Sequence, residues 1–172
     1  MFKIMLIIVI LIFCTSVGYI YGESFRKRYV ILKESYKCIT ILQNEVVFNN
    51  TPLPEAFMDV ASKTKEPMNV LLNRVSEKLS KGTECDVYSA FKSEFTSLEN
   101  DFFFAREDKS VLEDFVRSLG ESGVYGQEKI FKLSLENLKI NIEEAYELGK
   151  KNTKLYRYLG ICIGVMISIL LL

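Results

Sequence analysis

The chain begins with an apolar stretch, Ile4 to Tyr21, that contains no charged residue and is interrupted only by Thr15 and Ser16. A helix of that length nearly crosses a bilayer core of about 30 Å. A cleaved signal peptide also has a short basic start and an apolar run. No small-residue cleavage site is evident, however, and the bulky Phe13 before Cys14 argues against a lipidated cysteine. The pattern therefore favours an uncleaved transmembrane helix over residues 4–21.

After this stretch, apolar residues recur at spacings of three and four, the period of an amphipathic helix. The first such helix runs from Glu23 to about Asn49, with a heptad seam that includes Phe25 and Leu32. The apolar stripes of four shorter helices and one long helix follow. Their first apolar residues are Leu53, Met68, Tyr88, Val111 and Phe131. No strand-like alternation of useful length is seen, so the sequence predicts an all-α fold.

Helix ends are indicated by residues that suit them. Thr51 is expected to be an N-cap with Pro52 at the first helical position, which loses no needed N–H. Pro67 and Asp86 are expected to start the next two helices, and Gly82 suits a helix C-terminus. The fifth helix is predicted to end at Gly120 and the last to start near Ser122 or Gly123.

The last helix is predicted to run toward Tyr158 and to continue into a second apolar segment, residues 158–172. Fifteen residues are short for a full span, so this segment either crosses with little tilt or stays partly embedded. Because both long helices carry an apolar seam and end in membrane segments, each is the other's nearest partner. We expect a helical bundle in which the two pair antiparallel as a stalk carrying the shorter helices.

Charge is distributed unevenly. The flanks of both apolar segments are basic, whereas the region from Cys38 to Gly149 contains 20 acidic and 12 basic residues. This is the positive-inside pattern, and it predicts that the domain of residues 22–157 is cytoplasmic. Lys plus Arg equals Asp plus Glu at 22 each, so a nucleic-acid binder driven by overall charge is excluded.

The composition argues against a catalytic or metal-binding site. The chain has no histidine and no paired cysteines, so a zinc site or a histidine-dependent catalytic group is excluded. We therefore predict no catalytic residue, no cofactor and no metal. A membrane-anchored sensor remains the alternative, but it needs a cavity with convergent polar groups, and no such set is evident in the sequence.

Small residues recur every fourth position in both apolar segments, as Gly18 and Gly22 in the first and Gly160, Gly164 and Ser168 in the second. This spacing lets membrane helices approach closely, within one chain or between copies in a homo-oligomer. The other interpretation is that Gly and Ser are simply common in membrane helices.

Two stretches of the chain contain motifs that resemble those of a known family. The first is EVVFNNTPLPEA, Glu45 to Ala56, with the turn Thr51-Pro52-Leu53; the second is FVRSLGESGVYGQ, Phe115 to Gln127, with Leu119-Gly120. Together with the N-terminal anchor, the length and the apolar C-terminus, they resemble the stage III sporulation protein AB family of endospore-forming bacteria. The resemblance covers essentially the whole chain. One departure is Gly123, where the family usually has an aspartate that would cap the last helix.

The resemblance implies a membrane platform protein, related to the inner-membrane platform proteins of type II secretion and type IV pilus machines. Such a protein would be located in the mother-cell membrane around the forespore, as part of a channel complex. Its implied partners are the secretion-type ATPase of the same operon, the AA protein, and the other stage III A channel subunits. The tip helices, Thr51 to Gly120, are then the expected ATPase-binding region.

Overall fold

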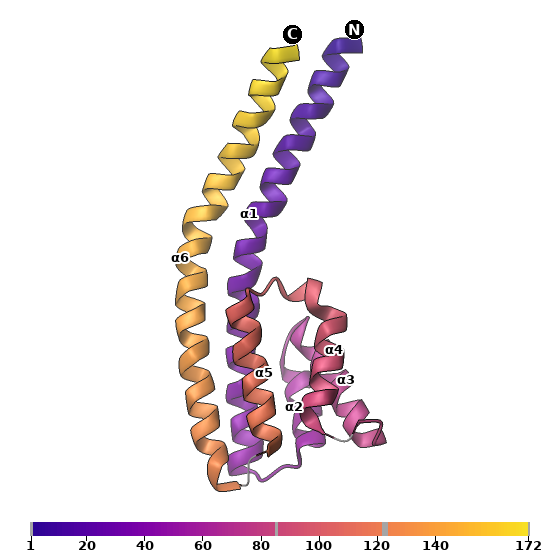
Figure 1. The fold of residues 1–172 in the computed structure, drawn as a ribbon, viewed down its shortest axis with the longest axis vertical. Coiled ribbons are helices and arrows are strands. Elements are labelled where there is room, and N and C mark those ends of the chain that lie inside the picture. The colour runs from indigo at the N-terminus through magenta and orange to yellow at the C-terminus, as the bar shows by residue number, and fades with distance from the viewer. Residues whose placement is uncertain (1, 85, 122–123, 172) are drawn as a thin grey trace. The chain divides into compact units, whose positions relative to one another are not determined.

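The computed structural model describes residues 2–84, 86–121 and 124–171, and these residues contain helices and no strands (Figure 1). The predicted all-α bundle with two long terminal helices is confirmed. The elements are α1 (Phe2–Gln43), a turn of π-helix η1 (Asn44–Phe48), α2 (Leu53–Lys63), α3 (Met68–Lys81), α4 (Val87–Phe102), α5 (Arg106–Glu121) and α6 (Val124–Leu171). The chain divides into two compact units, residues 1–29 with 144–172, and residues 30–143.

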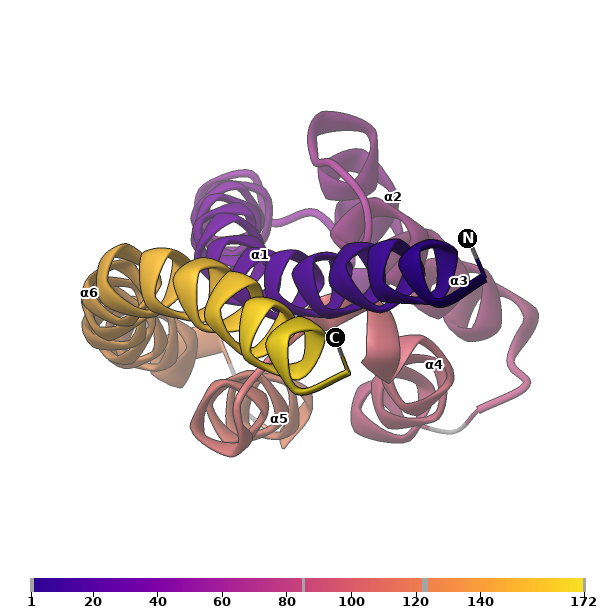
Figure 2. The same cartoon turned by 90° about the horizontal axis from the view of Figure 1, so that it is seen from above.

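The first unit is a pair of antiparallel helices, the N-terminal part of α1 and the C-terminal part of α6. Gly164 lies against Leu11, Gly160 against Gly18, and Gly149 against Phe25. Because the numbers rise on one helix as they fall on the other, the two helices run in opposite directions. The N-terminal part of α1 and the C-terminal part of α6 run alongside each other (Figures 1 and 2).

The second unit has a core made by the apolar stripes that the sequence predicts. Each of the helices α2 to α5 contacts the next. Leu32, Phe57, Leu71, Leu112 and Phe131 are among its fully buried side chains. Burying such a side chain contributes about 1.5–3 kcal/mol each, so these stripes supply most of the driving force for this unit.

The turn between α1 and α2 differs from the prediction. Thr51 is not the N-cap; Pro52 is, with an extended backbone (φ −57°, ψ 143°), and Pro54 occupies the second helical position. The Thr51 N–H donates instead to the Glu45 carbonyl oxygen at 2.9 Å, and its hydroxyl to the Glu45 carboxylate at 3.5 Å. Thr51 therefore closes the end of the preceding helix rather than starting the next.

The Glu45 carboxylate organises this turn. It also accepts from the Asn49 amide at 2.9 Å and pairs with Lys63 of α2 at 3.0 Å. These donors, first Asn49 and then Lys63, lower the pKa of Glu45 below its usual range. One acidic side chain thus ties η1 to α2.

Three other predicted helix ends are confirmed and one is wrong. Pro67 is the N-cap of α3. Gly82 ends α3 in the left-handed region at φ 65°, and the Asp86 side chain caps α4 by accepting from the Ser89 N–H at 2.7 Å. That N–H lowers the pKa of Asp86. Gly120, in contrast, does not end α5, which continues to Glu121.

The second familiar motif is therefore helical where it is described. Leu119 is buried on the apolar stripe of α5, and Gln127 is in the first turns of α6 rather than in a turn. The predicted start of the last helix at Ser122 or Gly123 lies outside the described residues. The buried stripe of α5 overrides the breaking tendency of a single glycine, which costs only about 1 kcal/mol.

Of the three consecutive phenylalanines at the end of α4, two pack in the core. Phe102 and Phe104 are buried with ring centroids 5.1 Å apart, and both contact Phe95. Phe103 between them is 39% exposed and adopts φ 53°. The left-handed residue ends α4 and allows both neighbours to point inward.

Cys38 on α1 gives a first prediction. Its thiol is buried, and desolvation, with a smaller effect of Glu34, raises its pKa from 9.0 to about 12. We expect that iodoacetamide at pH 8 labels Cys38 only after denaturation, because the thiolate is the nucleophile. Since the folded pKa is above the unfolded one, the stability from this proton is present below about pH 9 and lost as the pH rises toward 12.

The measurement uses a variant in which Cys14, Cys85 and Cys162 are serine, with labelling followed by mass spectrometry. The control adds Cys38→Ala and Asn137→Cys, which places a thiol at an exposed position of α6. We expect the control to label before denaturation. Equal labelling of the two folded variants would show that Cys38 is accessible.

Candidate functional site

The closest approach of the two apolar helices is at Gly18 and Gly160. A Cβ added to Gly18 would lie 2.7 Å from the Tyr156 carbonyl oxygen and 2.9 Å from the Gly160 Cα. A Cβ added to Gly160 would lie 2.9 Å from the Cys14 carbonyl oxygen. Because these neighbours are backbone atoms, only glycine fits at either position. Backbone contact of this kind is what small residues permit in membrane helices.

The other predicted small residues make weaker or different contacts. A Cβ at Gly22 would be 3.0 Å from the Thr153 carbonyl oxygen, and one at Gly164 would be 3.3 Å from the Cys14 Cβ. The Ser168 hydroxyl donates to the Gly164 carbonyl oxygen of its own helix at 2.7 Å. The structure thus brings Gly18, Gly22, Gly160 and Gly164 into one interface, whereas the hydroxyl of Ser168 bonds within α6.

A hydrogen bond also joins these two helices, near Gly22. The Thr153 hydroxyl donates to the Gly22 carbonyl oxygen at 3.0 Å. A hydroxyl–carbonyl bond between membrane helices contributes about 0.6–2 kcal/mol, so it adds to the packing and also sets the register.

Aromatic and charged side chains form a band where the apolar segments end. The rings of Phe25 and Tyr156 stack at 5.6 Å between centroids, with Tyr21 beside them at 5.1 Å from Tyr156. The guanidinium of Arg157 lies over the Tyr19 ring at 4.6 Å and 3.3 Å from the Glu23 carboxylate. Tyrosines and arginines at such a boundary are typical of a membrane–water interface.

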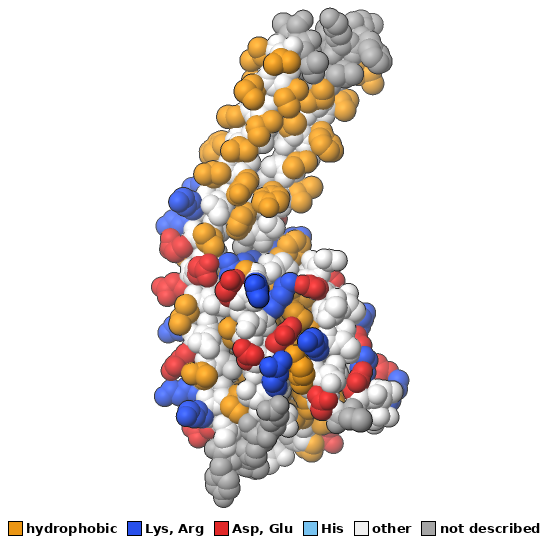
Figure 3. Space-filling view, viewed as in Figure 1, with side chains coloured by type: hydrophobic (Ala, Val, Ile, Leu, Met, Phe, Trp, Pro, Cys, Tyr) orange, Lys and Arg blue, Asp and Glu red, His pale blue; other side chains and the backbone are white. Residues whose placement is uncertain are grey.

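The outward faces of the apolar helices are exposed hydrophobic surface (Figure 3). Phe13 and Ile20 are each 69% exposed, and Ile169 is 72% exposed. By length and composition the described helices include two that could cross a membrane. A contiguous apolar surface of this kind is typical of a region that contacts lipid or protein.

Comparisons with known proteins assign the chain to a family. The family model for stage III sporulation protein AB matches residues 3–172. The chain belongs to the stage III sporulation protein AB family. The protein of that name from Bacillus subtilis (strain 168) is 23% identical over 172 residues, the full length of both chains. A solved structure of a stage III sporulation protein AB has the same fold, with a TM-score of 0.66, at 22% identity; the match covers 72% of this chain and 96% of that one.

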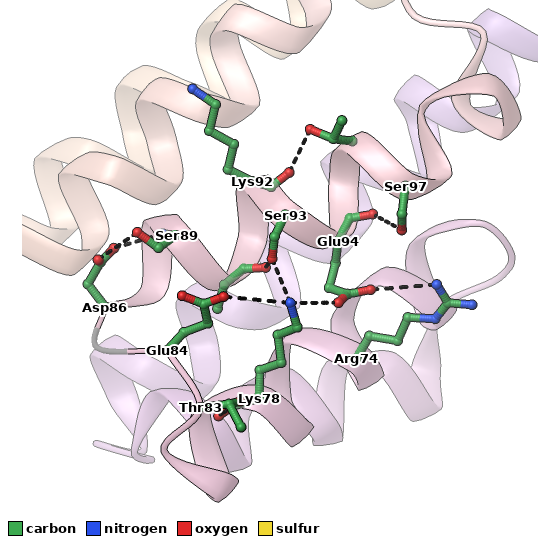
Figure 4. Close-up of polar contacts among 12 residues, drawn as sticks. Arg74, Lys78, Thr83, Glu84, Asp86, Ser89, Lys92, Ser93, Glu94 and Ser97 are labelled. Atoms are coloured by element: carbon green, nitrogen blue, oxygen red, sulfur yellow. Dashed lines mark hydrogen bonds and ion pairs between the residues drawn. The ribbon is translucent and has the colours of Figure 1, made fainter.

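The second unit carries a polar network between α3 and α4 (Figure 4). The Glu94 carboxylate pairs with Lys78 at 2.9 Å and with Arg74 at 3.5 Å, and Lys78 also donates to the Ser93 hydroxyl at 2.8 Å. Glu94 raises the pKa of Lys78. All of these charges have partners, so the network joins two helices and is a structural feature rather than a reactive one. Among the described residues no cluster of three His, Cys, Asp or Glu side chains could hold a metal ion.

A buried polar pair connects α5 to α6. The Asp108 side chain is fully buried. Its carboxylate accepts hydrogen bonds from the Asn141 amide at 3.0 Å and from the Ala105 N–H at 2.8 Å. Asp108 therefore caps the start of α5 and joins it to α6 at the same time.

Sequence reasoning missed Thr153, Asp108 and Asn141. A signal was present for each of them. Asp108 is four residues before Leu112, and Asn141 is three after Leu138, so both polar residues fall on apolar stripes. Thr153 continues the four-residue spacing from Gly149. A polar residue on a buried stripe needs a partner, and that requirement predicts a buried hydrogen bond.

Proposed function

We propose that this chain is a non-enzymatic membrane platform subunit of a sporulation-specific secretion-like channel, and that it binds the cognate cytoplasmic ATPase. The observation that carries the proposal is the pair of apolar helices whose inner faces meet at Gly18 and Gly160 and whose outer faces are exposed hydrophobic surface. Membership of the stage III sporulation protein AB family is consistent with a role in sporulation.

The apolar pair supports a membrane anchor made of both chain ends. Its inner face is closed by backbone contact, and its outer face is left for lipid or for the other channel subunits. Basic residues flank it on both helices, at Arg26 to Arg28 on α1 and at Lys150 to Arg157 on α6. By the positive-inside rule this charge pattern supports a cytoplasmic location of the second unit, in our proposal at the mother-cell membrane around the forespore.

The ATPase contact is proposed on the outer face of α2. Met58 is 56% exposed there, and Glu55 and Asp59 on either side of it are exposed as well. An apolar side chain between two acids suits a partner with a hydrophobic pocket and a basic rim. The region from Thr51 to Gly120 contains 13 acidic and 9 basic residues, so the acids of α2 are part of a moderately acidic surface.

The test is co-purification of the full chain, in mild detergent, with the AA-type ATPase of the same organism. We expect a specific complex that weakens at high salt, since exposed charge pairs are screened. Reversing two charges, Glu55→Lys with Asp59→Lys, is expected to weaken the complex roughly tenfold or more, because like charges then face each other. Binding is measured by microscale thermophoresis at two salt concentrations.

The matched control reverses two exposed acids of α6, Glu136→Lys with Glu143→Lys, and is expected to leave binding unchanged. Circular dichroism at 222 nm confirms that each variant is folded. If the folded wild-type chain forms no complex, the ATPase-binding role is wrong. If both variants lose binding equally, the contact is not on α2.

A further inference from the structure

A groove of about 430 Å³ runs along one flank of the two-helix unit. Both helices line it. The lining has four basic side chains, two tyrosines and the small residues Ala145, Gly149 and Thr153. The basic residues are Arg26 on α1 and Lys150, Lys154 and Arg157 on α6. The groove therefore collects positive charge from two chain segments that are far apart in the sequence.

Most of this charge is not neutralised by the protein. The Glu23 carboxylate is 2.6 Å from the Arg26 Nε and 3.3 Å from the Arg157 Nη2, so one acid is shared by two guanidiniums. Within the described part of the chain, no carboxylate lies within ion-pair distance of Lys150 or Lys154. Four cations facing one carboxylate leave a net positive site, which is an arrangement that suits an anion.

The groove continues toward the apolar end of the helix pair. A second groove of about 530 Å³ is lined by Arg157, Thr15, Ser16, Tyr19, Ile20 and Ile161. Arg157 lines both grooves, so they adjoin at its side chain. The combined surface is basic at one end and mainly apolar along the other, which matches the headgroup and acyl chain of a phospholipid.

We propose that this two-part groove binds an anionic phospholipid. Its headgroup phosphate would lie among Arg26, Lys150, Lys154 and Arg157, and one acyl chain would follow Tyr19, Ile20 and Ile161. Glu23 holds the two arginines in place through both oxygens of its carboxylate. Basic pockets between membrane helices are known to bind acidic headgroups. The tyrosines Tyr29 and Tyr146, whose tilted rings have centroids 5.5 Å apart, suit the interfacial depth.

This inference rests on the membrane anchoring in the proposed function, and the experiment separates the two. The full chain is first expressed in bacterial membranes and extracted with alkaline carbonate. Retention in the membrane shows anchoring whether or not the groove binds a lipid. Release of the chain would remove the membrane part of the proposed function, and this inference with it.

The lipid test is native mass spectrometry of the purified full chain in neutral detergent, with equimolar phosphatidylglycerol and phosphatidylcholine of identical acyl chains. We expect preferential retention of phosphatidylglycerol. Lys150→Gln with Lys154→Gln is expected to lower the ratio of bound phosphatidylglycerol to phosphatidylcholine roughly tenfold or more, since each juxtamembrane lysine contributes about a factor of five. An arm with excess inorganic phosphate is expected to displace no lipid, because free phosphate lacks the acyl chain.

The matched control, Lys129→Gln with Lys151→Gln, removes two lysine charges from the same helix outside the groove and is expected to keep the preference. Three results would overturn the proposal. These are a groove variant with wild-type lipid preference, an equal loss in the control variant, and displacement of phosphatidylglycerol by inorganic phosphate. The last would assign the basic end to free anions rather than to lipid.

Discussion

Replacing Gly18 with leucine is expected to separate the two apolar helices. Even the first added carbon would lie 2.7 Å from the Tyr156 carbonyl oxygen and 2.9 Å from the Gly160 Cα, and a backbone cannot move aside as a flexible side chain can. Overpacking typically costs about 1–3 kcal/mol and occasionally more. Since the contact is backbone against backbone on both helices, we expect the upper part of this range or beyond.

The separation can be measured with a disulfide that the structure allows. A Cβ at position 164 would lie 3.3 Å from the Cys14 Cβ, close to the usual disulfide range of about 3.5–4.5 Å. A Gly164→Cys variant, with Cys38→Ala, Cys85→Ser and Cys162→Ser, is expected to cross-link to Cys14 within one chain on mild oxidation in the membrane. Gly18→Leu added to this variant is expected to abolish most of that cross-link.

Two controls make this result specific. Val17→Leu enlarges the neighbouring residue, which is 49% exposed, and is expected to keep the cross-link. Val165→Cys in place of Gly164→Cys moves the thiol to an adjacent, 42% exposed position and is expected to give little cross-link. Cross-linking between two chains instead of within one would show that the glycines mediate pairing between copies.

Replacing Asp108 with alanine is expected to give the second large effect. The change removes a fully buried carboxylate that accepts from the Asn141 amide and the Ala105 N–H. Leaving the buried Asn141 amide without an acceptor costs about 1–3 kcal/mol, and the loss at the part-buried Ala105 N–H adds about 1 kcal/mol. We therefore expect destabilisation of the second unit by roughly 2–4 kcal/mol, with α5 losing its contact to α6 first. The measurement is thermal unfolding of the full chain in detergent, followed by circular dichroism at 222 nm.

The control for this prediction is Asp108→Asn, which keeps the shape and one acceptor oxygen. It is expected to cost less than the alanine variant, because at least one of the two donors retains a partner. Asn141→Leu tests the other side of the pair and is expected to leave the cap of α5 intact. An alanine variant as stable as the wild type would mean that the buried pair contributes nothing to the fold.

Much of the fold is predictable from the sequence because its signals are local. Apolar stripes at Leu32, Phe57 and Leu112 follow the helical period, and Gly82 and Asp86 end and start helices by their own backbone and side-chain chemistry. Thr51 was assigned wrongly because two helix ends compete for it. The Glu45 carbonyl and carboxylate bind Thr51 from the preceding helix, and the extended Pro52 then becomes the cap.

The sequence by itself determined the helical period, the two apolar ends, the basic flanks and the resemblance to the stage III sporulation protein AB family. Only the tertiary structure decided which small residues meet and what the polar stripe residues bind. The spacing of Gly18 and Gly160 is compatible with pairing inside the chain or between chains. The choice depends on backbone contacts between residues more than a hundred positions apart, which a period of three to four residues cannot encode. In the structure, Gly18 and Gly160 of the same chain meet, in antiparallel helices.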